Sequence, residues 1–198
     1  MEIKTSLTVA DLEATPRPLE GGGYELDEGE LVYVSPNSLE QWQIIHRSYT
    51  LLKGFVDAHN LGLVTADTWF EILPRGVRAP DVAFVPVERL TGIDPKHALK
   101  AAPALVIEVL GSSDPKAARR IALRSSARLA GTARDMARRI RQYFEAGLKV
   151  VLVVDPDERE VDVYEPSAPL RTLTMTDTFE APEILPGFSL PIARLFEE

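Results

Sequence analysis

Residues 103–114 read Pro-Ala-Leu-Val-Ile-Glu-Val-Leu-Gly-Ser-Ser-Asp, an apolar run with one carboxylate, Glu108, in its middle. The apolar residues on both sides of Glu108 are typical of a strand that is buried on both faces, as at the centre of a mixed or parallel sheet. An ionised carboxylate in such a strand costs several kcal/mol unless it is paired, hydrogen-bonded or bound to a cation. Glu108 therefore needs a partner, and two remain open: an arginine from the following segment, or a metal ion.

The composition of the 198-residue chain, 45% hydrophobic and 26% charged, is typical of a globular, soluble protein. No run approaches the roughly 18 apolar residues of a membrane helix, and the N-terminus lacks the apolar core of a signal peptide. We therefore expect a cytoplasmic protein with no membrane segment. Because the chain has no cysteine and only three scattered histidines, any metal ion must be held by oxygen ligands.

Positive charge is concentrated in one segment, although the whole chain has a net charge of −8. Residues 116–149 contain ten basic and two acidic residues. Such asymmetry indicates a surface that faces a polyanion such as DNA, although an arginine-rich helix can equally dock on its own acidic protein or on a partner subunit. The arginines expected to contact nucleic acid are Arg119, Arg120, Arg124, Arg128 and Arg138.

Turn-forming residues in the first part of the chain predict a loosely held arm over residues 1–23, followed by a single domain over residues 24–198. The domain is expected to open with an antiparallel hairpin and to alternate strands with two amphipathic helices. The expected helices cover residues 38–59 and 115–146, the latter interrupted at 131–132. The expected strands cover residues 24–27, 31–35, 63–66, 68–73, 81–86, 105–110, 149–154, 161–164 and 170–175.

Asp81 and Glu108 are the two carboxylates that stand out from apolar strands. Two carboxylates brought together repel each other unless a positive group lies between them, and oxygen ligands suit a hard cation such as Mg²⁺ (or Mn²⁺). Magnesium also takes phosphate oxygens and makes a bound water more acidic, which is the chemistry of a metal-dependent nuclease. The structural alternative is that Asp81, which follows Pro80, only caps a turn.

Several segments in order resemble the Uma-type family of bacterial restriction-endonuclease-like proteins, in the PD-(D/E)XK nuclease superfamily. They are Arg78-Ala-Pro-Asp-Val-Ala-Phe-Val85, the stretch 103–114, and a helix with Tyr143 in Tyr-Phe-Glu-Ala-Gly147 ahead of Val151-Leu-Val-Val-Asp-Pro156. The match spans about residues 24–190. The resemblance implies an α/β restriction-endonuclease-like fold, with a central mixed β-sheet flanked by helices and an N-terminal antiparallel hairpin.

The resemblance also implies roles for individual residues. Asp81 and Glu108 would be the metal-binding carboxylates, with the backbone carbonyl of Val109 as a further ligand. The lysine that many relatives carry on the later helix is replaced by Arg139. Because an arginine stays protonated, Arg139 cannot act as a base, but it can hold a water molecule or the scissile phosphate. An ion pair with Asp135 on the same helix is its structural alternative.

Four further residues are candidate auxiliary groups of the site, and each also has an ordinary structural explanation. Glu40 and Gln41 lie in the first turn of the long helix, where Gln41 replaces a histidine that is common in the family. Glu71 lies on the strand before the Pro-Asp pair, and Tyr143 is expected in the core.

The sequence thus predicts an endonuclease that uses Mg²⁺ to hydrolyse DNA phosphodiester bonds. The alternative is a nuclease-fold protein that has lost cleavage and acts in nucleic-acid or protein binding. The two departures from the family, Arg139 and Gln41, allow this alternative. A homodimer is expected, since cutting both strands of a duplex requires two sites and symmetric dimers are the commonest assembly.

Overall fold

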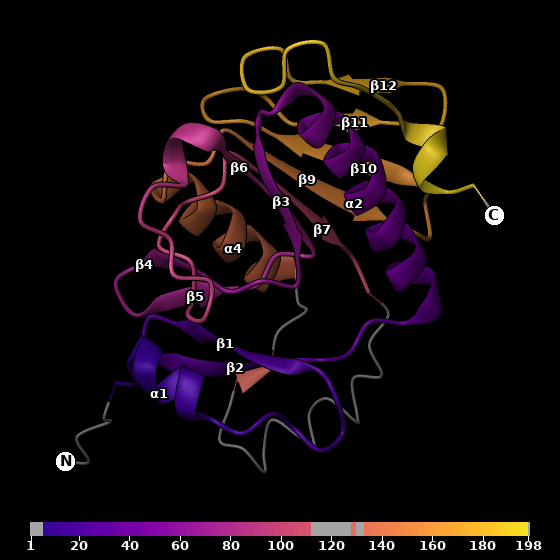
Figure 1. Ribbon diagram of the computed structural model, residues 1–198. Helices are drawn as coiled ribbons and strands as arrows, with labels where there is room; N and C mark the ends of the chain where they lie inside the picture. Colours follow the sequence, from indigo (N-terminus) through magenta and orange to yellow (C-terminus); the bar gives the residue numbers. More distant parts are fainter. Residues whose placement is uncertain (1–5, 112–127, 130–132, 198) are drawn as a thin grey trace.

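The computed structural model describes residues 6–111, 128–129 and 133–197, which form a mixed α/β structure (Figure 1). A six-stranded sheet is its largest unit, with the strand order β11-β10-β9-β7-β6-β3. Its strands are β3 (Gly62–Ala66), β6 (Val82–Pro86), β7 (Leu105–Val109), β9 (Val150–Asp155), β10 (Glu160–Tyr164) and β11 (Arg171–Leu173). Strand β7 is antiparallel to β6 and parallel to β9, so the sheet is mixed.

Two helices cover the two faces of this sheet: α2 (Leu39–His59) and α4 (Ala133–Glu145). Alternate residues of β7 belong to two different hydrophobic clusters, because side chains along a strand point to opposite faces. Ile107 packs in the cluster that contains Leu52 of α2, whereas Val106 packs in the cluster that contains Ile140 of α4. All five residues of β7 are buried, as the apolar run predicted, and the expected central mixed sheet flanked by helices is confirmed.

Helix α2 begins and ends with the signals that its sequence contains. Ser38 caps its N-terminus in a reciprocal pair of hydrogen bonds with Gln41, which satisfies two backbone N–H groups that lack helical partners. Asn60, in the left-handed conformation at φ 54°, ends the helix. The expected helix over residues 38–59 is therefore confirmed.

A second, five-stranded sheet has the order β4-β5-β1-β2-β8 and lies at the lower end of the molecule in Figure 1. Strands β1 and β2 of this sheet form the expected hairpin. Strand β5 lies in the chain between the expected strands 68–73 and 81–86. The strands are β1 (Gly23–Asp27), β2 (Glu30–Val34), β4 (Phe70–Leu73), β5 (Gly76–Arg78) and β8 (Arg128–Leu129). Residues 128–129 were expected to be helical, but they pair in parallel with β2, since an unpaired strand edge outweighs a local helical preference.

Helix α1 (Val9–Ala14) packs against this second sheet (Figure 1). Thr8 and Asp11 form a capping box at its start, and Leu12 is fully buried in a cluster with Leu26 and Val77. The described part of the expected loose arm, residues 6–23, is therefore attached to the domain through Leu12. The sequence did not reveal this contact because α1 contributes a single buried side chain.

The C-terminal part completes the fold with β12 (Thr178–Glu180), β13 (Ser189–Pro191) and the short helix η2 (Ile192–Leu195), while η1 (Val87–Arg89) follows β6. Strands β12 and β13 form a separate antiparallel pair. In the part of the chain that the structure describes, no helix is long and apolar enough to cross a membrane.

Candidate active site

Asp81 and Glu108 lie next to each other on neighbouring strands. Asp81 directly precedes β6, and the antiparallel register that pairs Val82 with Ile107 places Asp81 opposite Glu108. Residues opposite each other in an antiparallel pair project to the same face, here the face covered by α4. The backbone N–H of Val109 donates to Oδ2 of Asp81 at 2.6 Å, which anchors this carboxylate to the end of β7.

Burial makes ionisation of both carboxylates more costly. Burial raises the pKa of Asp81 well above its usual range, and the neighbouring Glu108 raises it further. Burial also raises the pKa of Glu108, although Arg139 and Tyr143 act in the opposite direction. Among the described residues, Asp81 has no cationic side chain in ion-pair contact. A cation between these carboxylates would stabilise the ionised form of each of them.

Arg139 of α4 forms an ion pair with Glu108, with 3.1 Å between Nη1 and Oε1. Its guanidinium also contacts both carboxylate oxygens of Glu25, at 3.0 Å for Nη1 and 2.7 Å for Nη2. Burial alone would lower the pKa of Arg139, but Glu108 and Glu25 raise it well above the ordinary value. The arginine partner considered for Glu108 is therefore present, and Arg139 stays charged.

Tyr143, one helical turn after Arg139, donates its hydroxyl hydrogen to the same oxygen of Glu108 at 2.5 Å. Its side chain is fully buried, as expected for a core residue. Burial and the adjacent Glu108 raise the pKa of Tyr143 well above 10, so the hydroxyl keeps its proton and remains a donor. Among the described residues, both contacts to the Glu108 carboxylate involve Oε1.

A buried polar network joins this site to the N-terminal hairpin. Arg78 of β5 contacts Glu25 at 3.0 Å and Asp27 at 3.0 Å, and it donates to the amide oxygen of Gln142. Gln142 in turn donates to Asp27 at 2.8 Å. All four side chains are buried.

Sequence reasoning assigned no role to Glu25, Asp27 or Gln142, and Arg78 was only part of a motif. One signal was available: Glu25 and Asp27 alternate on one face of a short strand, and arginines cluster on one face of the later helix. That signal shows which face of the strand is acidic and which face of the helix is basic, but it does not show which acid pairs with which arginine.

Gln41 is the only one of the three remaining auxiliary candidates with a described contact to the site residues. Its side-chain amide donates to the carbonyl of Val109 at 3.4 Å, and a Cβ on Gly111 would lie 2.3 Å from the same amide nitrogen. Glu40 is exposed, and Glu71 lies 3.9 Å from the ammonium group of Lys100.

Of the basic segment 116–149, the structure describes residues 128–129 and 133–149. Arg138 contacts Asp27 at 3.3 Å and Glu28 at 3.0 Å, so its side chain docks on the acidic hairpin of its own chain. Arg128 is described as part of β8 without its side chain. The remaining predicted contacts, Arg119, Arg120 and Arg124, lie outside the described residues.

The donor set at Asp81 and Glu108 suits a hard cation that is only partly held by protein. Within residues 6–111 and 133–197, no three histidine, aspartate or glutamate side chains are grouped as metal ligands. Two carboxylates and the Val109 carbonyl would leave positions for water or phosphate oxygens, which is the coordination that magnesium prefers. The buried network contains three acids, Glu25, Asp27 and Glu108, and two arginines, Arg78 and Arg139, so one negative charge is in excess among these buried groups, and a cation is compatible with this balance.

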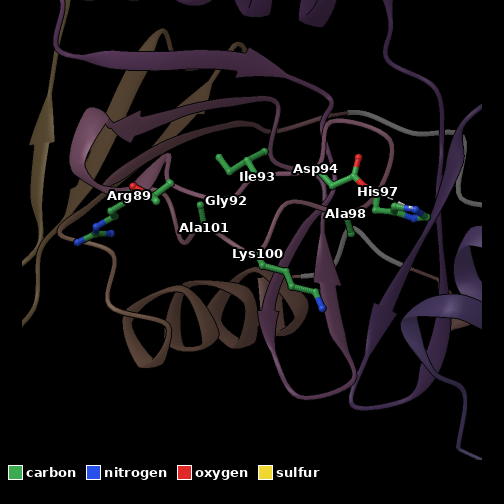
Figure 2. Close-up of a pocket in the computed structure, with 9 residues that line it drawn as sticks. Arg89, Gly92, Ile93, Asp94, His97, Ala98, Lys100 and Ala101 are labelled. Atoms are coloured by element: carbon green, nitrogen blue, oxygen red, sulfur yellow. Dashed lines mark ion pairs between the residues drawn. The ribbon is translucent and has the colours of Figure 1, made fainter.

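A separate pocket of about 320 Å³ lies under the loop between β6 and β7, lined by residues between Arg89 and Ala101 (Figure 2). His97 at its edge pairs with Glu13 of α1 at 3.0 Å. None of the site residues described above lines this pocket.

The fold and the carboxylates on adjacent strands define a restriction-endonuclease-like protein. The chain belongs to the Uma2 family, described as "Putative restriction endonuclease", whose family model matches residues 9–193. The chain is also similar to a solved structure from Anabaena variabilis ATCC 29413, described as "a putative nuclease belonging to DUF820". The two share 17% identity with a TM-score of 0.72, over 96% of this chain and 97% of the other, which shows a common fold. No curated protein matches the chain.

Proposed function

We propose that this protein is a metal-dependent endonuclease that hydrolyses DNA phosphodiester bonds. The observation that carries the proposal is the position of Asp81 opposite Glu108, with Val109 bonded to Asp81, in a member of a restriction-endonuclease family. The carboxylate and carbonyl oxygens support Mg²⁺ or Mn²⁺ as the metal, and the family's description supports DNA as the substrate. The cytoplasmic location stays a prediction from the sequence.

Asp81, Glu108 and the Val109 carbonyl would hold Mg²⁺ (or Mn²⁺). The bound ion supplies two effects, a more acidic water molecule and stabilisation of negative charge on the phosphodiester. Arg139 and Tyr143 hold Oε1 of Glu108, so they orient this carboxylate. Because the Arg139 guanidinium is engaged by two carboxylates, its contribution is to fix Glu108, in addition to the positive charge that it brings near a phosphate.

Calorimetric titration with Mn²⁺ and Mg²⁺ tests the proposal. We expect binding to the wild type, loss of binding in Asp81→Ala, and no change in Asp57→Ala, which removes an exposed carboxylate of α2. Cleavage of single-stranded DNA, duplex DNA and RNA in Mg²⁺ and in EDTA then identifies the substrate. Metal binding that does not depend on Asp81 would exclude this assignment.

A second candidate function is nucleic-acid or protein binding without cleavage. It is favoured by Arg139, which occupies the lysine position and is engaged by Glu25 and Glu108. This candidate predicts no hydrolysis in any metal, together with DNA retention that falls steeply as the salt concentration rises.

We also propose a homodimer, because cutting a duplex on both strands requires two sites. Light scattering coupled to gel filtration measures the mass, which for one chain is 21.9 kDa.

A further inference from the structure

Glu25 is connected to both carboxylates of the candidate metal site, Glu108 and Asp81. It lies on β1 with 1% of its surface exposed, and each of its carboxylate oxygens accepts two hydrogen bonds. Arg139 approaches both oxygens, at 3.0 Å and 2.7 Å. This two-point contact fixes the guanidinium in position and orientation.

The first connection runs through Arg139 to Glu108. A single nitrogen, Nη1, lies 3.0 Å from Oε1 of Glu25 and 3.1 Å from Oε1 of Glu108. One positive charge is therefore shared by two carboxylates. If Glu25 lost its charge, the whole charge of Arg139 would act on Glu108 and would repel a cation bound to the same carboxylate.

The second connection runs through the backbone to Asp81. The N–H of Ala79 donates to Oε1 of Glu25 at 2.9 Å, and only Pro80 separates Ala79 from Asp81. Arg78, the residue before Ala79, also contacts Glu25 at 3.0 Å. Glu25 thus holds the start of the segment that presents Asp81, as well as the arginine that holds Glu108.

We propose that Glu25 is a positioning residue of the metal site, which neutralises Arg139 and fixes the Arg78–Asp81 segment so that Asp81 and Glu108 together bind a divalent cation. The inference rests on the proposed function, because it concerns the same cation. It assigns a role to the N-terminal hairpin, which contributes no ligand of its own.

Mn²⁺ titration of the metal-free protein by calorimetry measures this role. Substitution of residues that orient metal ligands typically weakens metal binding about 10–100-fold, and we expect Glu25→Gln to weaken Mn²⁺ binding by that factor. The matched control is Glu13→Gln on α1, whose carboxylate likewise accepts a backbone N–H, from Ala98, and contacts His97, outside the buried network. Its affinity for Mn²⁺ should stay within about threefold of the wild type.

The double variant Glu25→Gln/Arg139→Gln separates electrostatic positioning from general structural support. It removes one negative and one positive charge, so we expect it to bind Mn²⁺ more tightly than Glu25→Gln alone. If Glu25 only supported the structure, the double variant would bind no better than the single one. Circular dichroism and urea unfolding verify that each variant is folded at the titration temperature.

The possible outcomes are distinct. If the wild type binds Mn²⁺ through Asp81 while Glu25→Gln binds equally well, or if Glu13→Gln weakens binding as much, the role of Glu25 is excluded and the proposed function stands. If the wild type shows no binding that depends on Asp81, both the proposed function and the role of Glu25 are excluded. Weaker binding in Glu25→Gln, recovered in the double variant, supports the role.

Discussion

The hydroxyl of Tyr143 lies 2.5 Å from Oε1 of Glu108, and both side chains are buried between α4 and the central sheet. This contact joins the helix to the strand that runs through the centre of the fold. It also determines which oxygen of Glu108 faces the helix, so the same hydrogen bond serves stability and the geometry of the candidate site.

Replacing Tyr143 with phenylalanine removes this hydrogen bond and leaves the ring in place. We expect the free energy of unfolding to fall by about 1–3 kcal/mol, because a buried charged acceptor loses a donor. Urea unfolding measures the change. Tyr33→Phe is the control, since the Tyr33 hydroxyl donates to the neutral carbonyl of Gly21 at 3.3 Å and its loss should cost less. Equal losses in the two variants would contradict a special role for the contact with Glu108.

Arg78→Ala should destabilise the fold strongly. Its loss leaves Glu25 and Asp27 buried without this cation, and breaking a buried ion pair from one side costs about 3–5 kcal/mol. Arg171→Ala, which removes an exposed ion pair with Glu165, should cost less than about 1 kcal/mol. Urea unfolding of the two variants provides the comparison, and similar values would show that the buried network contributes little.

Asp81→Asn should change how stability depends on pH. The raised pKa of Asp81 means that the folded protein binds more protons than the unfolded chain at pH values above the ordinary 3.8. The contribution of Asp81 to the free energy of unfolding therefore falls as the pH rises through this range. Since asparagine does not ionise, Asp81→Asn should gain stability relative to the wild type as the pH rises, when measured by urea unfolding in EDTA.

Asp177→Asn is the control of opposite sign. Hydrogen bonds from Thr174 lower the pKa of Asp177, so its carboxylate stabilises the fold above the ordinary pKa, and this contribution is lost as the pH falls. Relative to the wild type, Asp177→Asn should therefore lose stability as the pH rises. A gain in both variants would contradict the assignment for Asp81.

Divalent metal ions should raise the melting temperature of the wild type. A ligand that binds only the folded state at a concentration a hundredfold above its Kd adds about 2.7 kcal/mol, which is several degrees for a domain of this size. Scanning calorimetry in Mg²⁺ and in EDTA measures the shift. Glu108→Gln should abolish it, whereas Glu71→Gln, on β4, should retain it; a shift that survives in Glu108→Gln would place the ion elsewhere.

Local patterns in the sequence were sufficient to predict the central strand β7 and the long helix α2. The apolar run around Glu108 predicted a strand buried on both faces, and Ser38 and Asn60 marked the ends of the long helix, as the structure shows. These features depend on side-chain periodicity and on capping, which act within a few residues. The order of the matching segments then predicted the family, and the resemblance assigned Asp81 and Glu108 to one metal site.

The partners of the charged side chains were decided only by the tertiary structure. Arg139 contacts Glu25, which is 114 positions away, and residues 128–129 pair with β2 although their composition favours a helix. The sequence of each segment specifies its charge and its face. Which opposite charge meets it depends on how sheets and helices pack, and a buried charge is stable only where that packing brings a partner within hydrogen-bonding distance. Glu108 was recognised from the sequence as a carboxylate that needs a partner, and packing supplied Arg139, Tyr143 and the adjacent Asp81.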